Sequence, residues 1–63
     1  MDAAAEEFRL NLKWVFDHRA QFTGYWVALK SGVCVERDTV QFRVQEAVRK
    51  RSDRSDIMLM RVG

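Results

Sequence analysis

Two residues with a wide chemical repertoire each occur once in this chain. His18 is the single histidine and Cys34 is the single cysteine. A catalytic Cys–His pair needs both side chains within hydrogen-bond reach and an oxyanion site nearby. No nucleophile-turn motif accompanies either residue. We therefore expect His18 to complement a helix C-terminus and Cys34 to be a small apolar residue of a sheet.

Other reactive constellations are also missing from the sequence. One histidine and one cysteine fall short of the three or four ligands that zinc requires. The carboxylates are scattered and mostly flank bases, and no glycine-rich loop that could cradle a phosphate is present. The sequence therefore predicts no catalytic residue, cofactor or metal site, and we expect that the protein is not an enzyme.

Positive charge is concentrated in the second part of the chain. The net charge is +2, with five bases against six acids in residues 1–38 and six bases against three acids in residues 39–63. Basic side chains can meet phosphates, but cations in a last helical turn also favour the helix dipole, and nearby acids neutralise part of the charge. Nucleic-acid binding is therefore the alternative hypothesis, without a motif for base-specific reading. Its candidate residues are Arg43, Arg49, Lys50, Arg51 and Arg54.

Large apolar side chains form the other group of interest. Taken together, these side chains exceed what one face of so small a sheet can bury, and aromatic residues and methionine are enriched at interfaces. The members that carry this argument are Trp14, Trp26, Phe42, Met58 and Met60. We predict a protein-interaction module, a homodimer that docks on a larger protein partner. The candidate interface residues are Leu10, Trp14, Trp26, Phe42, Met58 and Met60.

A first helix is predicted over residues 3–20, with Asp2 as its N-terminal cap. An apolar stripe at i, i+4, i+7 and i+8 is typical of a core-facing helix. It consists of Phe8, Leu12, Val15 and Phe16. Leu10 and Trp14 lie to one side of this stripe, so we expect their edge to contact another chain.

A β-hairpin follows, with strands over residues 25–30 and 33–37 and a turn at Ser31-Gly32. Two registers are open. A three-residue loop of residues 30–32 places Tyr25, Val27, Leu29, Val33 and Val35 on one face, whereas a two-residue loop places Val33 and Val35 with Trp26 and Ala28. We favour the first, because it concentrates apolar residues on one side.

A second helix is predicted from Asp38-Thr39 to about Arg51. Its inward stripe consists of Val40, Val44, Ala47 and Val48, and Phe42 points away from that stripe. A last strand covers residues 57–62, and it is apolar on both sides.

The predicted fold is one α+β domain over residues 1–63, in the order α-β-β-α-β. A right-handed crossover through the second helix gives a three-stranded sheet of order 2-1-3. Both helices are expected on one face, so that something else, such as a second copy, covers the other. No apolar run is long enough for a membrane span, no signal peptide is expected, and the lone cysteine suits a reducing compartment. We therefore expect a cytoplasmic protein.

The chain resembles a family of short prokaryotic proteins with no assigned activity. The resemblance rests on the Gly-x-Trp-Val-Ala strand within residues 22–28, the Lys30-Ser31-Gly32-Val33 turn, Asp38-Thr39-Val40 and the final Arg61-Val62 pair. It covers about residues 14–62. Thr23 stands where the family often has proline. The resemblance implies the fold of a helix, a hairpin, a capped helix and a strand, and it implies no catalytic residue.

Overall fold

A computed structural model describes the backbone of residues 3–63 and the side chains from Ala5 onward. Its elements are α1 (Ala3–Asp17), α2 (Arg19–Phe22), β1 (Trp26–Lys30), β2 (Val33–Asp38), α3 (Gln41–Arg49) and β3 (Met58–Arg61). The expected element order is confirmed, with the predicted first helix divided at His18. The expected cap at Asp2 lies outside the described residues.

The three strands form one antiparallel sheet in the order β2-β1-β3, as predicted. β1 is therefore the central strand, and β2 and β3 are the two edges. The pairing of β1 with β3 continues beyond the strand ends, because Val62 N–H donates to Tyr25 O at 2.8 Å and Gly24 N–H donates to Val62 O at 2.7 Å. Val62 is consequently fully buried next to the end of β1.

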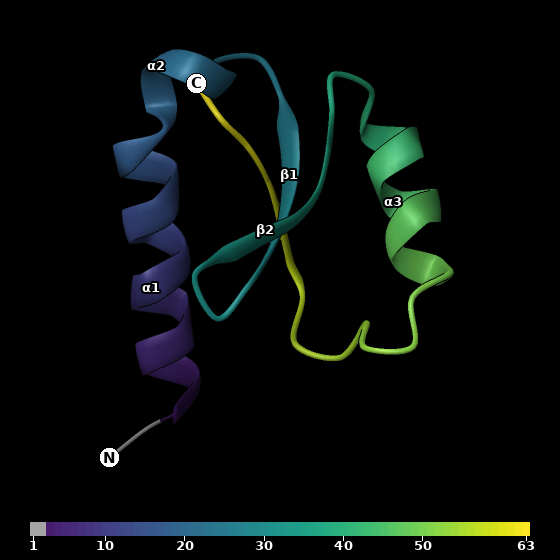
Figure 1. The fold of residues 1–63 in the computed structure, drawn as a ribbon, viewed down its shortest axis with the longest axis horizontal. Coiled ribbons are helices and arrows are strands. Elements are labelled where there is room, and N and C mark those ends of the chain that lie inside the picture. The colour runs from purple at the N-terminus through teal and green to yellow at the C-terminus, as the bar shows by residue number, and fades with distance from the viewer. Residues whose placement is uncertain (1–2) are drawn as a thin grey trace.

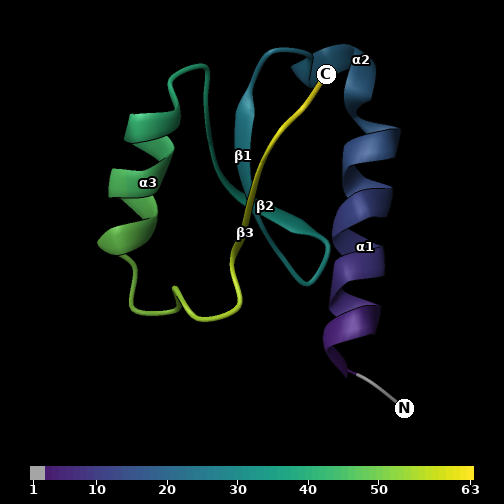
Figure 2. The same ribbon diagram turned by 180° about the vertical axis from the view of Figure 1, so that it is seen from behind.

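The two long helices lie on opposite faces of the sheet, and not on one face as predicted. Figures 1 and 2 show α1 and α3 on either side of the three strands. The helices on both faces also explain why β1 is buried on both sides. Val27 and Leu29 point toward α1, whereas Ala28 points toward α3, and all three residues are fully buried. The two-sided apolar pattern of the last strand is explained by this arrangement, since no face of the sheet is left without a helix.

The hairpin adopts the register that the sequence analysis did not favour. Lys30 pairs with Val33, so the loop consists of Ser31 and Gly32 alone, and both have positive φ, 50° and 81°. This geometry is typical of two-residue hairpin turns. The register shifts between Ala28 and Leu29, which leaves a bulge in β2.

The two-residue loop reverses the alternation that was expected along the first part of β2. Cys34 now lies opposite Leu29 and packs against the core on the α1 side. Val33 is 58% exposed, although the favoured register had placed it in the core. Hydrophobic content alone predicted a register that the turn geometry does not support.

Helix α3 is shorter than predicted and begins after an extended Val40. Asp38 stabilises the turn that precedes the helix, because its Oδ1 accepts the N–H of Val40 at 2.9 Å. Val44 is buried as expected, and Ala47 and Val48 are half-buried. Val40 was expected inward but is 44% exposed, since it precedes the helix and does not share its inward face.

Candidate interaction surface

The sheet-facing side of α1 is not the apolar stripe that the sequence analysis predicted. Residues 7, 11, 14 and 18, at helical spacing, face inward instead. Asn11 is 3% exposed, and its Oδ1 accepts the N–H of Gly32 at 2.7 Å. The helix is thereby attached to the hairpin turn through a buried polar contact.

Two further contacts fix this rotation of α1. Leu10 packs over the turn, with its Cβ only 3.0 Å from where a β-carbon on residue 32 would lie. Trp14 packs against the core and stacks on His18, with ring centroids 4.2 Å apart. Leu10 and Trp14, both predicted as interface residues, therefore contact the hairpin and the core of their own chain.

As a result, three of the four residues of the predicted core stripe face outward. Phe8 is 53% exposed, Leu12 40% and Phe16 77%, and only Val15 packs against the core. These three side chains recur every four residues, so they form one ridge along the outer side of α1.

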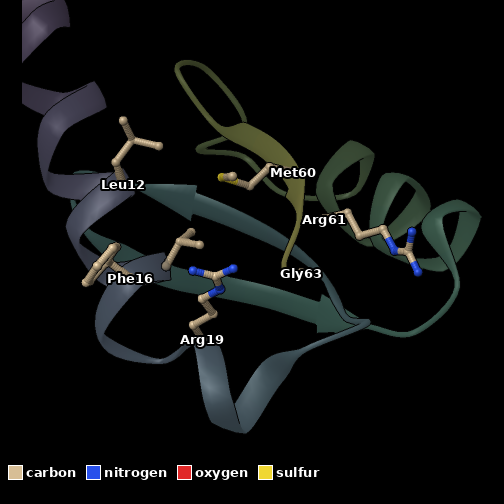
Figure 3. A pocket seen from close by; sticks show the side chains of 7 residues that line it. Leu12, Phe16, Arg19, Met60, Arg61 and Gly63 are labelled. Atoms are coloured by element: carbon tan, nitrogen blue, oxygen red, sulfur yellow. The ribbon is translucent and has the colours of Figure 1, made fainter.

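A hollow of about 380 Å³ lies between this ridge and β3. Leu12, Val15 and Phe16 line one wall, and Met60 points into it from β3 (Figure 3). Arg19 closes one end, while the side chain of Arg61 points away from the hollow (Figure 3). We call the ridge Phe8, Leu12 and Phe16, together with this hollow, the α1–β3 surface.

The edge of β3 adjoins this surface and carries little charge. Its outer side has no neighbouring strand among residues 3–63, and Arg61 is its single charged residue. The opposite edge, β2, contains a bulge and the charged run Glu36-Arg37-Asp38, both of which discourage pairing with another chain. The two edges of the sheet therefore differ in their suitability for intermolecular contact.

The other predicted interface residues lie in different places. Met58 and Met60 are half-buried and pack against the α1-side core. Trp26 is half-buried at the start of β1, opposite Asp38 and Arg61. Phe42 points outward from α3 with 64% exposure, as the helical pattern predicted. Only Met60 of the predicted set lines the α1–β3 surface.

The predicted basic cluster is largely occupied by ion pairs with acidic residues. The guanidinium of Arg51 donates to Glu36 at 2.9 Å and to both carboxylate oxygens of Asp53 at 2.8 and 3.1 Å. These contacts lower the pKa of Asp53, chiefly through the hydrogen bonds from Arg51. Arg49 pairs with Glu46 at 3.1 Å, and Arg43 lies 4.0 Å from Asp38. Lys50 and Arg54 are exposed, and Arg54 donates to the Arg51 carbonyl.

His18 and Cys34 have separate partners. The Nδ1 of His18 donates to the carbonyl of Trp14 at 2.8 Å, near the end of α1. The Cys34 thiol donates to the Glu36 carbonyl at 3.3 Å, and partial burial raises its pKa. No cluster of three or more metal-ligating side chains occurs in the part of the chain that the structure describes.

The fold and the surface define a small α+β domain with helices on both faces of an antiparallel sheet. The chain matches no family model, and comparisons with curated proteins and with solved structures give no match. The resemblance to the short prokaryotic family therefore stays a prediction. Among the helices described, none is both long and apolar enough to cross a membrane.

Proposed function

We propose that this chain is a small non-catalytic protein-interaction module that self-associates through the α1–β3 surface and docks on a larger protein partner. The observation that supports this most strongly is the exposure of Phe8, Leu12 and Phe16 beside the hollow over Met60. Contiguous exposed apolar groups on a soluble chain mark contact sites. Exposure of these side chains to water is unfavourable, and contact with another polypeptide would remove them from water.

The small size of the core supports association as well. Among the described residues, only Val27, Ala28, Leu29, Val44 and Val62 are fully buried hydrophobic residues. Chains of this length gain limited stability from a single core and often depend on oligomerisation. A contact that covers the α1–β3 surface would therefore stabilise the fold itself.

Docking on a larger partner is assigned to the opposite face. Phe42 and Val40 are exposed at the start of α3, which lies across the sheet from α1 (Figure 2). Self-association through α1 leaves this group accessible. Nucleic-acid binding through residues 43–54 has less support, because the acids Glu36, Glu46 and Asp53 already neutralise much of that cluster.

The proposal is tested by the solution mass measured with light scattering over a range of protein and salt concentrations. The wild type should rise from 7.4 kDa toward twice that value, and salt should change this little, since apolar contacts dominate. Phe16→Asp should keep the chain monomeric. Phe42→Asp is the matched control, with the same change at a similarly exposed phenylalanine on the other helix, and it should associate like the wild type.

Two outcomes would contradict this assignment. Association that is unchanged in Phe16→Asp would mean that the contact surface lies elsewhere. A chain that stays monomeric alone but gains mass with random duplex DNA at low salt would favour the basic residues of α3 and the following loop.

A further inference from the structure

The outer edge of β3 presents backbone hydrogen-bonding groups to a neighbour. Val62 both donates and accepts on the β1 side. Because this direction alternates along an antiparallel ladder, Met58 and Met60 also face β1, and the N–H and C=O groups of Leu59 and Arg61 point outward. Within residues 3–63 no strand lies beyond β3, and these four groups have no backbone partner. An extended polypeptide strand is the partner that satisfies such a row of groups.

This edge lies on a broad side of the molecule. The Cα atoms span 35 × 29 × 12 Å along the principal axes, and Figures 1 and 2 look down the shortest axis from its two ends. In Figure 2, β3 crosses in front of β1, with α1 and α3 to its two sides. The hollow between α1 and β3 adjoins the same edge. A neighbour that pairs with β3 therefore also meets the α1–β3 surface.

The outward groups of β3 are self-complementary. When two copies meet antiparallel about a two-fold axis at Met60, Leu59 of each copy pairs with Arg61 of the other, and all four outward groups of each strand are satisfied within the two strands. An axis at Arg61 would place the two Arg61 side chains directly opposite each other, which is unfavourable. An axis at Leu59 would pair Arg61 with Ile57, which lies outside β3. The axis at Met60 is therefore the favoured one.

The broad side also offers enough area for a stable dimer. Its 35 by 29 Å outline allows a copy seated on it to cover up to roughly 1,000 Å², compared with about 800 Å² per partner in a standard interface. A two-fold axis perpendicular to the sheet keeps α1 of both copies on the same face. The two hollows then adjoin above the paired strands, so that Leu12 and Phe16 of each copy lie near both Met60 side chains.

We infer that a second copy of this chain binds at the β3 edge, with the two β3 strands antiparallel, Leu59 hydrogen-bonded to Arg61 of the other copy, and Met60 at the two-fold axis. The two three-stranded sheets become one continuous sheet. This inference rests on the proposed self-association, and it assigns the contact to backbone groups of β3 that an α1 substitution does not change.

Backbone N-methylation tests the hydrogen bonds without altering any side chain. In a chemically synthesised chain, N-methyl-Leu59 should weaken the dimer at least about tenfold, because two intermolecular hydrogen bonds are lost. N-methyl-Arg37 is the matched control. Arg37 pairs with Val27, whose backbone groups face β3, so the N–H of Arg37 points outward from the other edge. This chain should dimerise like the wild type, and circular dichroism should show both chains folded.

Disulfide formation tests the register. In a Cys34→Ser background, Met60→Cys should form a covalent dimer under mild oxidation, because facing β-carbons at such a non-hydrogen-bonded position lie about 5 Å apart, close to what a disulfide needs. Met58→Cys is the matched control, since Met58 lies on the same face of β3 but opposite Val62 of the other copy. It should cross-link at least about fivefold more slowly.

The outcomes separate the two proposals. If Phe16→Asp abolishes the dimer and N-methyl-Leu59 leaves it unchanged, β3 pairing is overturned and the α1–β3 surface is retained. If N-methyl-Leu59 weakens the dimer and Phe16→Asp does not, β3 pairing is supported and the role of the ridge is overturned. A dimer in which Met58→Cys cross-links as fast as Met60→Cys overturns the register. If the wild type never associates, both proposals are overturned.

Discussion

The two faces of the sheet are closed by different means. On the α1 face, large side chains surround Val27 and Leu29, with Trp14, Phe22 and Tyr25 in one aromatic group. On the α3 face, the fully buried residues are the small Ala28 and Val44. The rim of the α3 face is polar, because Arg51 joins Glu36 to Asp53 and Lys30 Nζ donates to the carbonyl of Asp53 at 2.8 Å.

This difference shows which side of the sheet leaves more apolar side chains exposed. The α3 face buries little apolar area and completes its rim with charges, and Val40 and Phe42 are its exposed large apolar side chains. The α1 face buries the larger share of the core, yet its helix is turned by Asn11 and Trp14 so that Phe8, Leu12 and Phe16 stay outside. The larger group of exposed apolar side chains therefore lies on the α1 side, and this is the side on which we propose self-association.

The largest expected effect comes from emptying the core on each face. Leu29→Ala should lower the free energy of unfolding by about 3 kcal/mol and Val44→Ala by about 2 kcal/mol, measured by urea denaturation of the monomeric Phe16→Asp chain. Because the two residues lie on opposite sides of the sheet, the double variant should be additive to within about 0.5 kcal/mol. A negligible effect of Val44→Ala would show that α3 is not packed on the sheet.

Much of the fold follows from the sequence. The Ser31-Gly32 turn, the β-branched and aromatic strands and the crossover rule predict the element order and the strand order correctly. The placement of the helices was predicted wrongly, with both on one face, because strand periodicity cannot decide which face each helix covers. The apolar pattern of residues 57–62 is the signal for a sheet covered on both sides, and a helix on each face accounts for it without a second copy.

The candidate surface was much harder to predict. Counting apolar residues at helical spacing assigned Phe8, Leu12 and Phe16 to the core. The inward stripe contains the polar residues Asn11 and His18. Asn11 accepts the N–H of Gly32, which is distant in sequence, and His18 donates to the carbonyl of Trp14 one helical turn earlier. The available signal for the inward face was Asn11, which lies about one helical turn before Trp14. This signal could be interpreted only once the position of the hairpin turn was known.

A smaller effect is expected from the contact that sets the rotation of α1. Asn11→Ala removes the acceptor for the N–H of Gly32 and leaves that donor half-buried without a partner. The free energy of unfolding should fall by about 2 kcal/mol, measured by urea denaturation in the Phe16→Asp background. Gln45→Ala, an exposed amide on α3, is the control and should change stability very little. An unaffected Asn11→Ala chain would mean that packing of Trp14 alone positions the helix.

The smallest effect concerns the charged rim of the α3 face and is best measured as a pKa. Arg51 holds the pKa of Asp53 below its ordinary value through two hydrogen bonds, whereas Lys13 on α1 does the same for Asp17. A depressed carboxyl pKa stabilises the fold at pH values above the unfolded pKa of about 3.9, and this contribution is lost as the pH falls through the folded pKa. In Arg51→Gln, NMR titration should show the pKa of Asp53 rising toward 3.9 while that of Asp17 stays low. If both values stay low, the rim of the α3 face is not held by Arg51, and the contrast between the two faces would rest on the size of their buried side chains alone.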